Sequence, residues 1–409
     1  MFNSNFNLDS FSRFLISEYN IIKLNNQLHI YNDGVYVNDL TEIESKMIQK
    51  IPNLTRNKRA EVLAYLDLLI RNNSKEADAE YIAFKNGLFN VYKQELEPFD
   101  KGFILTNKID FDYNENAYSE IADNTLKDLS CENEKIRMLL EELIGYTLYR
   151  RNYFKKAFIL IGDKNNGKST FLDLLSFVLG NENISSLSLK ELNDRFKTSL
   201  LFHKLANIGD DIDDDLIYDS STFKKIVSGD RIVVERKNEQ PFEFTPYAKL
   251  IFSANDLPKI KDKTGAVISR LILIPFNADF TENRNPFLRY ELQSKESAEY
   301  IIKIGVNGLL RLIKNQCFTL PNEVEKAINK YKIENNPVLD FCNSKTAYEI
   351  TGKPVKNVYE EFCELYQNSN VSNIEFSRQI KKYLNVDVRV AKISGKSIRV
   401  YTSTNLNLL

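Results

Sequence analysis

Apolar and polar residues along the chain follow patterns that predict alternating strands and helices. Residues 157–161 are apolar throughout, which is typical of a buried strand. Residues 169–179 follow with helical spacing and end at Gly180, a residue that commonly terminates helices. Apolar runs at 205–211, 248–255 and 268–276 predict three further strands. The pattern therefore favours an α/β fold.

The pattern changes on both sides of this core. Residues 28–31 and 35–37 surround Asn32-Asp33-Gly34 and predict a β-hairpin, and 59–69 has the spacing of a helix. Helices are also predicted between 121 and 150, over 298–314 and over 321–332. We therefore expect four regions. They are an α+β domain over 1–120, a helical segment over 121–150, the core over 151–335 and a tail domain over 336–409.

The tail has a distinct charge and pattern. From Ser372 onward it carries seven basic and two acidic residues. Helices are predicted over 358–366 and 375–384, the latter with Phe376, Ile380 and Tyr383 on one face, and strands over 386–390 and 397–401. Two helices followed by a hairpin are typical of a winged helix, in which Arg378 and Lys381 would face a DNA groove. The alternative is a basic face that only packs against protein.

The loop between the first predicted strand of the core and its helix is the main candidate for chemistry. It matches the complete G-x-x-x-x-G-K-[ST] phosphate-loop pattern. It also lies between a predicted strand and a predicted helix, as this pattern requires. Backbone N–H groups and the helix N-terminus would hold the phosphates of ATP, Lys168 would reach the β and γ oxygens, and Ser169 would ligate Mg²⁺. The predicted nucleotide-binding residues are Gly162, Asp163, Lys164, Asn165, Asn166, Gly167, Lys168, Ser169 and Thr170.

Polar residues at the ends of the other predicted strands suit the same chemistry. Asp210 and Asp211 close the second strand, where one carboxylate would hold Mg²⁺ and the other would polarise the attacking water. Asn255 closes the third strand, where its amide would sense the γ-phosphate. Arg270 lies at the mouth of the fourth. These residues are the predicted catalytic set, together with Lys168.

In this order and spacing, the loop, acidic pair, asparagine and arginine resemble the superfamily 3 helicases of viruses, phages and plasmids. The chain is most similar to the phage and plasmid primase-helicase family that includes the poxvirus-type enzymes, in a form without a primase module. The resemblance covers residues 80–400, and it includes 84–91 and 105–113, which are similar to the family's pre-ATPase domain. It implies an AAA+-like P-loop ATPase core, a homohexameric ring, 3′ to 5′ translocation on one DNA strand, and an Arg270 that acts on a neighbouring subunit's ATP.

A second DNA contact is predicted in the core. Residues 231–244 have the pattern of a β-hairpin with its tip near 237–240. In the family that the chain resembles, this hairpin enters the ring channel and a lysine grips the DNA backbone, and Lys237 is the matching position. Asn238 follows where many relatives carry an aromatic residue. We therefore expect the tip to contact phosphates rather than to stack on bases.

Composition narrows the class of protein. The 409 residues, 43% hydrophobic and 27% charged, are enough for two or three domains, and a net charge of −1 requires any nucleic-acid surface to be local. Four cysteines without a C-x-x-C pair and only two histidines argue against a zinc site or disulfide framework. The sequence shows no signal-peptide pattern and no apolar run of membrane-spanning length. We expect a protein of the bacterial host cytoplasm with no membrane partner.

These observations predict an ATP- and Mg²⁺-dependent DNA helicase that acts on single-stranded and forked DNA. It would serve replication of a phage, plasmid or mobile genetic island, alongside a separate primase or initiator. Two alternatives stay open. Asp110 and Asp112 form a D-x-D pair of the kind that holds metals in a primase. An origin-binding initiator would use ATP only as an assembly switch and would read DNA through the tail.

Overall fold

The computed structural model describes residues 6–209, 220–237, 239–257, 265–282, 285–367, 369 and 371–404. The described chain divides into two compact units. The first holds the residues up to 256 together with 270–321, and the second holds 257, 265–269 and 322–404. The predicted four-region division, with its boundary at 335/336, stays a prediction. None of the described helices combines the length and apolar character that crossing a membrane requires.

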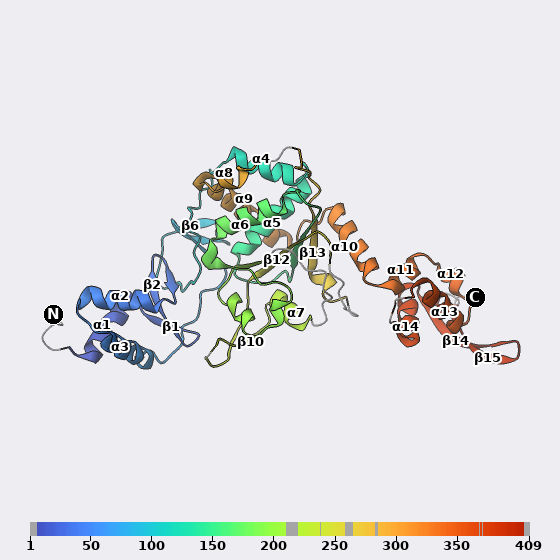
Figure 1. Ribbon diagram of the computed structural model, residues 1–409, viewed down its shortest axis with the longest axis horizontal. Helices are drawn as coiled ribbons and strands as arrows, with labels where there is room; N and C mark the ends of the chain where they lie inside the picture. Colours follow the sequence, from blue (N-terminus) through green and yellow to red (C-terminus); the bar gives the residue numbers. More distant parts are fainter. Residues whose placement is uncertain are drawn as a thin grey trace. The chain divides into compact units, whose positions relative to one another are not determined.

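A five-stranded parallel sheet forms the core of the first unit. Its strands are β7 (Ala157–Ile161), β8 (Ile184–Ser185), β9 (Ala206–Gly209), β12 (Lys249–Ala254) and β13 (Leu271–Pro275), in the order β13-β7-β12-β9-β8. Every residue of β12 is buried, as expected for a strand covered on both faces. In Figure 1, β12 and β13 lie below α5 (Glu134–Leu148) and α6 (Lys168–Leu179) and above α7 (Ser221–Ser228). The predicted α/β core and its four main strands are confirmed.

The last predicted strand starts later than expected. Residues Ile268–Arg270 form a 3₁₀ turn, and β13 begins only at Leu271. The apolar pattern could not separate the two, because Ile268 is buried like the strand residues that follow it. Arg270 therefore precedes the sheet instead of belonging to it.

Helices α4 (Glu120–Leu129) and α5 (Glu134–Leu148) fall in the predicted helical segment, and α5 packs closely against α9 (Lys295–Asn315). The contact depends on glycine: a Cβ at Gly145 would collide with the carbonyl of Gly305, and one at Gly308 with the backbone of Glu141. Glu142, fully buried at this contact, accepts hydrogen bonds from Thr319 and Arg311. The pairing joins two segments more than a hundred residues apart.

The N-terminal part builds a small core of its own. Helices α1 (Leu8–Tyr19), α2 (Leu40–Lys50) and α3 (Arg56–Leu69) pack with the sheet β1 (Ile22–Leu24), β2 (Gln27–Asn32) and β3 (Val35–Val37). The predicted hairpin and the helix near 59–69 are confirmed as β2, β3 and α3. Asp33 and Gly34 both have positive φ, which a two-residue turn of this kind requires. A second sheet follows, formed by β4 (Tyr81–Phe84), β5 (Gly87–Asn90) and β6 (Glu95–Glu97).

The second unit consists of helices followed by one hairpin. The helices are α10 (Asn322–Glu334), α11 (Pro337–Asn343), α12 (Ala347–Ile350), α13 (Val355–Leu365) and α14 (Asn373–Tyr383), and the hairpin strands are β14 (Val386–Ile393) and β15 (Lys396–Ser403). Phe376 and Ile380 are buried in its core, as predicted. Tyr383, predicted on the same helix face, is the last residue of α14 and is 37% exposed.

Candidate nucleotide site

The loop at residues 162–167 joins the carboxyl end of β7 to α6. Two glycines fix its path: a Cβ at Gly162 would collide with the Asn166 side chain, and one at Gly167 with Leu129. Gly167 also has a φ of +83°, which favours glycine. No side chain caps α6. The loop therefore presents helix-terminal N–H groups within a curve that larger residues could not form.

The loop is also tied to the chain that follows β13. Asn166 is buried, and its Nδ2 donates to the carbonyl of Phe276 at 2.7 Å. The backbone N–H of Phe280 donates to the carbonyl of Asn165 at 3.0 Å. These bonds hold the loop in one shape, as preorganised binding of an anion requires.

Lys168 is the first residue of α6 and is 8% exposed. Its ammonium lies inside the curve of the loop and donates to the carbonyls of Gly162 and Asp163 and to Asn166 Oδ1 at 3.1 Å. It also donates to Asn255 Oδ1 at 3.1 Å. The tertiary structure thus brings together two of the predicted catalytic residues, 87 positions apart.

The sheet explains why Asn255 meets this lysine. Strands β7 and β12 are parallel neighbours, with Ile161 opposite Ala254. Their carboxyl ends therefore lie at one edge of the sheet, and the residues that follow them face the same space. Ligands in open α/β sheets commonly bind at this edge.

A pocket of about 1300 Å³ opens above the loop. One wall consists of residues 163–170, and others come from α4 and from residues 285–296, which include α8 (Leu288–Leu292). Arg289 on α8 forms an ion pair with Asp173 on α6 at 3.2 Å. The cavity is large enough for a nucleoside triphosphate. Sequence reasoning missed the walls from α4 and α8, because neither carries a motif.

Two predicted residues of the site, Asp210 and Asp211, lie outside the described residues, as does Asn238. Strand β9, which leads to the acidic pair, ends at Gly209 and lies beside β12, with Gly209 opposite Phe252. Strand β9 therefore ends on the side of the sheet where the candidate nucleotide loop lies.

Arg270 lies at the amino ends of the strands, whereas the loop lies at their carboxyl ends. It precedes Leu271, which pairs with Ala157 at the start of β7, whereas the loop follows Ile161 at the end of that strand. The length of β7 alone separates them by about 13 Å. Arg270 does not line the nucleotide pocket of its own chain, and it donates to Ser228 Oγ at 3.2 and 3.3 Å.

The predicted DNA contacts are spread over both units. In the first, β10 (Ile232–Val234) and β11 (Phe242–Phe244) form the expected hairpin, with Lys237 exposed beyond β10. In the second, Arg378 pairs with Glu375 at 2.7 Å and Lys381 with Asp387 at 2.6 Å. Both α14 cations are thus already partnered within their own unit.

The two carboxylates of the D-x-D pair point to different partners. Asp110 lies 3.8 Å from the Lys108 ammonium, and Asp112 lies 3.1 Å from that of Lys295. Each carboxylate is paired with a lysine, an arrangement typical of surface ion pairs.

Two family models match parts of this chain. Residues 13–144 match the family described as "D5 N terminal like", and residues 160–270 match a "Family of unknown function (DUF5906)". "Putative helicase 121R" of Invertebrate iridescent virus 3 is 25% identical over 338 residues, which cover 70% of this chain and 35% of that protein. "Putative helicase V13" of Sputnik virophage is 24% identical over 295 residues, covering 66% and 37%.

The chain spans between 29% and 41% of the length of the curated relatives that it matches. Among solved structures, the apo C-terminal region of NrS-1 superposes with a TM-score of 0.58 at 14% identity, over 96% of this chain and 98% of that one. At this identity the likeness concerns the fold alone.

Proposed function

We propose that this chain is an ATP-dependent DNA helicase of replication, related to the phage and viral primase-helicase-like proteins that it resembles. The observation that carries the proposal is the position of Lys168. Its ammonium lies within the glycine-rich curve at the N-terminus of α6 and also bonds Asn255 on the neighbouring strand. A cation in such a curve suits the phosphates of a nucleotide.

The residues of the pocket fit ATP with Mg²⁺. The tight glycines and the uncapped helix leave room for phosphate oxygens, and Lys168 would bond them in place of its present acceptors. Ser169 would hold Mg²⁺ together with Asp210 and Asp211, and the ion would neutralise charge between the β and γ phosphates. Asn255 would contact the γ-phosphate, because it already bonds the lysine beside it.

We place Arg270 in the site of a neighbouring subunit. Its position at the far edge of the sheet supports this role, because it cannot line the nucleotide pocket of its own chain. An arginine donated in this way accelerates phosphate transfer by about 10³ to 10⁵ in analogous sites. The proposed enzyme therefore works as a ring, of six subunits in the family that it resembles, moving 3′ to 5′.

Lys237 at the hairpin beyond β10 would grip the DNA backbone, with Asn238 beside it. The second unit would serve as a winged helix, since two helices and a hairpin follow one another in the order that this module needs. Arg378 and Lys381 would contribute modest contacts there, because each must first leave a carboxylate.

Unwinding of a fluorescent forked duplex tests the proposal. We expect ATP-dependent strand separation by the natural chain and none by Lys168→Ala. Lys135→Ala, which removes an exposed lysine elsewhere in the same unit, should unwind normally. ATP turnover without strand separation would count against a helicase and in favour of an initiator.

A further inference from the structure

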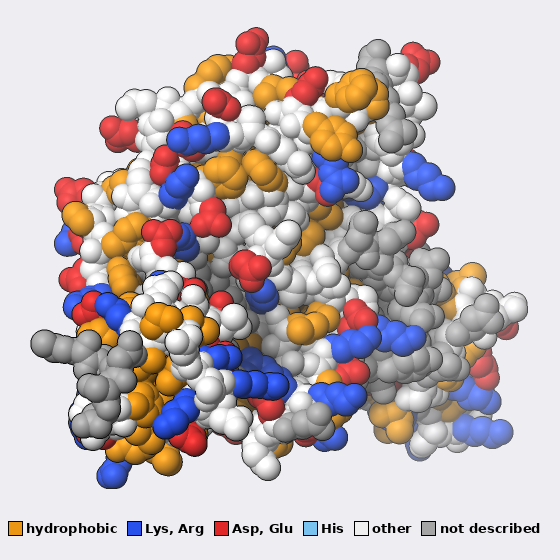
Figure 2. All heavy atoms as spheres, turned by 60° about the vertical axis from the view of Figure 1, so that its left-hand side comes forward, with side chains coloured by type: hydrophobic (Ala, Val, Ile, Leu, Met, Phe, Trp, Pro, Cys, Tyr) orange, Lys and Arg blue, Asp and Glu red, His pale blue; other side chains and the backbone are white. Residues whose placement is uncertain are grey.

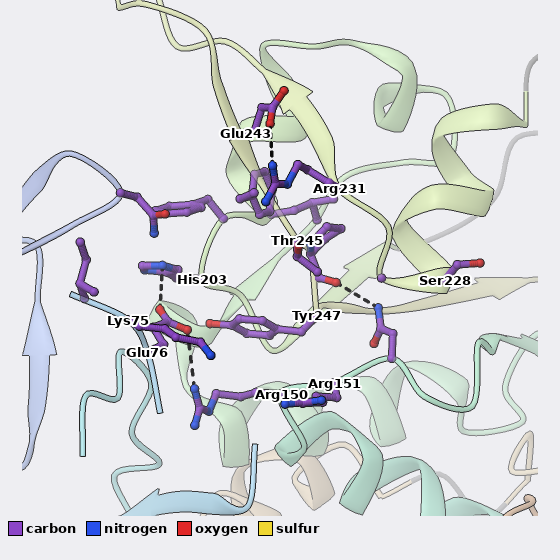
Figure 3. Close-up of a pocket in the computed structure, with 18 of the residues that line it drawn as sticks. Lys75, Glu76, Arg150, Arg151, His203, Ser228, Arg231, Glu243, Thr245 and Tyr247 are labelled. Atoms are coloured by element: carbon purple, nitrogen blue, oxygen red, sulfur yellow. Dashed lines mark hydrogen bonds and ion pairs between the residues drawn. The ribbon is translucent and has the colours of Figure 1, made fainter. Parts of the chain in front are cut away.

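A second pocket of the first unit, with a volume of about 570 Å³, shares no residue with the nucleotide pocket. Figure 3 shows Arg150 and Arg151 on one side of it, Arg231 and Glu243 on the other, and Glu76, His203 and Tyr247 between them. We call it the basic pocket. It is lined by residues from six segments, at 24–25, 74–76, 150–155, 201–203, 228–231 and 243–247.

The charge of the basic pocket is strongly positive, although the whole chain has a net charge of −1. Among the described residues, its lining contains five Lys or Arg side chains and two carboxylates. Both carboxylates are partnered: Glu243 pairs with Arg231 at 3.2 Å, and Glu76 accepts from His203 Nε2 at 2.9 Å. Burial tends to raise the pKa of Glu76, but His203 and Arg150 hold it below its usual value. The positive charge therefore prevails.

Two cations of the lining, Lys75 and Lys155, are exposed, and neither ammonium makes an ion pair or hydrogen bond within the described residues. Tyr153 lines the same pocket, with 59% of its surface exposed and its ring 5.2 Å from the Arg151 guanidinium. A pocket that combines ammonium groups with an exposed aromatic ring suits a single strand, whose phosphates bind cations and whose bases stack on rings.

The basic pocket also adjoins the proposed DNA hairpin. Arg231 immediately precedes β10, and Glu243 lies in β11, so the pocket is at the base of the hairpin beyond which Lys237 is exposed. On the face drawn in Figure 2, both signs of charge are mixed and Lys and Arg side chains gather below the middle. Positive charge is thus concentrated in part of this face. A protein without net positive charge needs such a local concentration to bind nucleic acid.

We infer that the basic pocket binds single-stranded DNA, with Lys75 and Lys155 on neighbouring phosphates and Tyr153 against a base. The volume is suited to one nucleotide unit at a time. The inference rests on the proposed helicase function. It adds a contact for the strand at the base of the hairpin, separate from Lys237.

The test uses Lys75→Glu combined with Lys155→Glu and measures binding of a fluorescent oligo-dT strand at several salt concentrations. The matched control is Lys135→Glu with Lys314→Glu, two exposed lysines of the same unit that line neither pocket. We expect the first pair to weaken binding at least tenfold at low salt. The slope of log K against log salt should fall by about 1.4, since each phosphate contact on a single strand contributes about 0.7.

Thermal unfolding checks that each variant folds. Unchanged affinity in the first pair, or an equal loss in the control pair, would overturn the inference. So would competition by dTMP at the concentration at which oligo-dT competes, because the pocket would then hold a free nucleotide. A natural chain that binds oligo-dT through these lysines but neither hydrolyses ATP nor unwinds a fork would sink the proposed function and leave the basic pocket standing.

Discussion

The nucleotide loop and the basic pocket belong to the same unit but are built in opposite ways. The loop and the start of α6 are consecutive in the sequence and are completed by the amide of Asn255, whereas the basic pocket needs six segments between residues 24 and 247. The loop encloses the ammonium of Lys168, whereas the pocket leaves those of Lys75 and Lys155 exposed and without a partner among the residues that the structure describes. We therefore expect the loop to recognise one ligand by shape. The pocket would bind by charge, and its affinity would depend on salt concentration.

Replacement of Arg270 by Ala should have the largest effect on ATP turnover, a loss of about 10³-fold. Arg270 lies at the opposite end of the strands from the loop of its own chain. Mixing with Lys168→Ala subunits should therefore restore part of the ATPase activity. A mixed ring would contain interfaces with one intact loop and one intact arginine. The measurement is steady-state ATPase activity of mixtures. Activity that stays at the level of the separate variants would place Arg270 outside the neighbouring site.

The rigidity of the loop can be tested through Asn166. Replacement by Ala removes the bond to the Phe276 carbonyl and one acceptor of Lys168. We expect kcat/KM for ATP to fall by about 100-fold, because small misplacements of positioned groups have effects of this size. Asn329→Ala, at an exposed position of α10, is the control. A change confined to thermal stability would show that the loop keeps its shape without this bond.

Acid should lower the free energy of unfolding through His29, a buried histidine that packs beside His203 of the basic pocket. His29 packs 6.0 Å from His203, and burial lowers the pKa of His29 to about 4. The unfolded chain binds a proton near pH 6.5 and the folded chain does not, so stability is complete above pH 6.5 and falls towards pH 4. The loss at pH 5 is about 2 kcal/mol. Denaturant unfolding at several pH values measures it, and His29→Gln should flatten the dependence. An equally steep dependence in His29→Gln would assign it to other groups.

The smallest effect is expected in the second unit. Arg378→Ala with Lys381→Ala removes two cations that are already paired with Glu375 and Asp387. We expect duplex binding to weaken only about threefold, because exposed ion pairs contribute little and compete with DNA. Fluorescence anisotropy with a labelled duplex measures the change. A loss as large as that expected for Lys75 and Lys155 would remove the distinction between paired and unpaired cations.

Local sequence pattern predicted most of the elements that form the site. Strands β7, β9 and β12, helix α6, the hairpin of β10 and β11, and the hairpin of β14 and β15 all appear where the pattern placed them. These elements depend on periodicity and on glycines within a few residues, which a single sequence displays. The predicted start of the last strand was wrong, because a buried residue of a 3₁₀ turn such as Ile268 has the same apolar character as a strand residue.

The strand, the candidate loop and its lysine could be read from the sequence alone, because the pattern predicted for a phosphate loop consists of consecutive residues. Three relations could be seen only in the folded chain: Asn255 bonds Lys168, Arg270 lies at the amino ends of the strands, and Lys75 and Lys155 line one pocket. Strand order and the packing of distant segments fix these relations. They are set by the burial of apolar surface across the whole fold. The sequence around each of these residues therefore carries no pattern that shows which other residue it will meet.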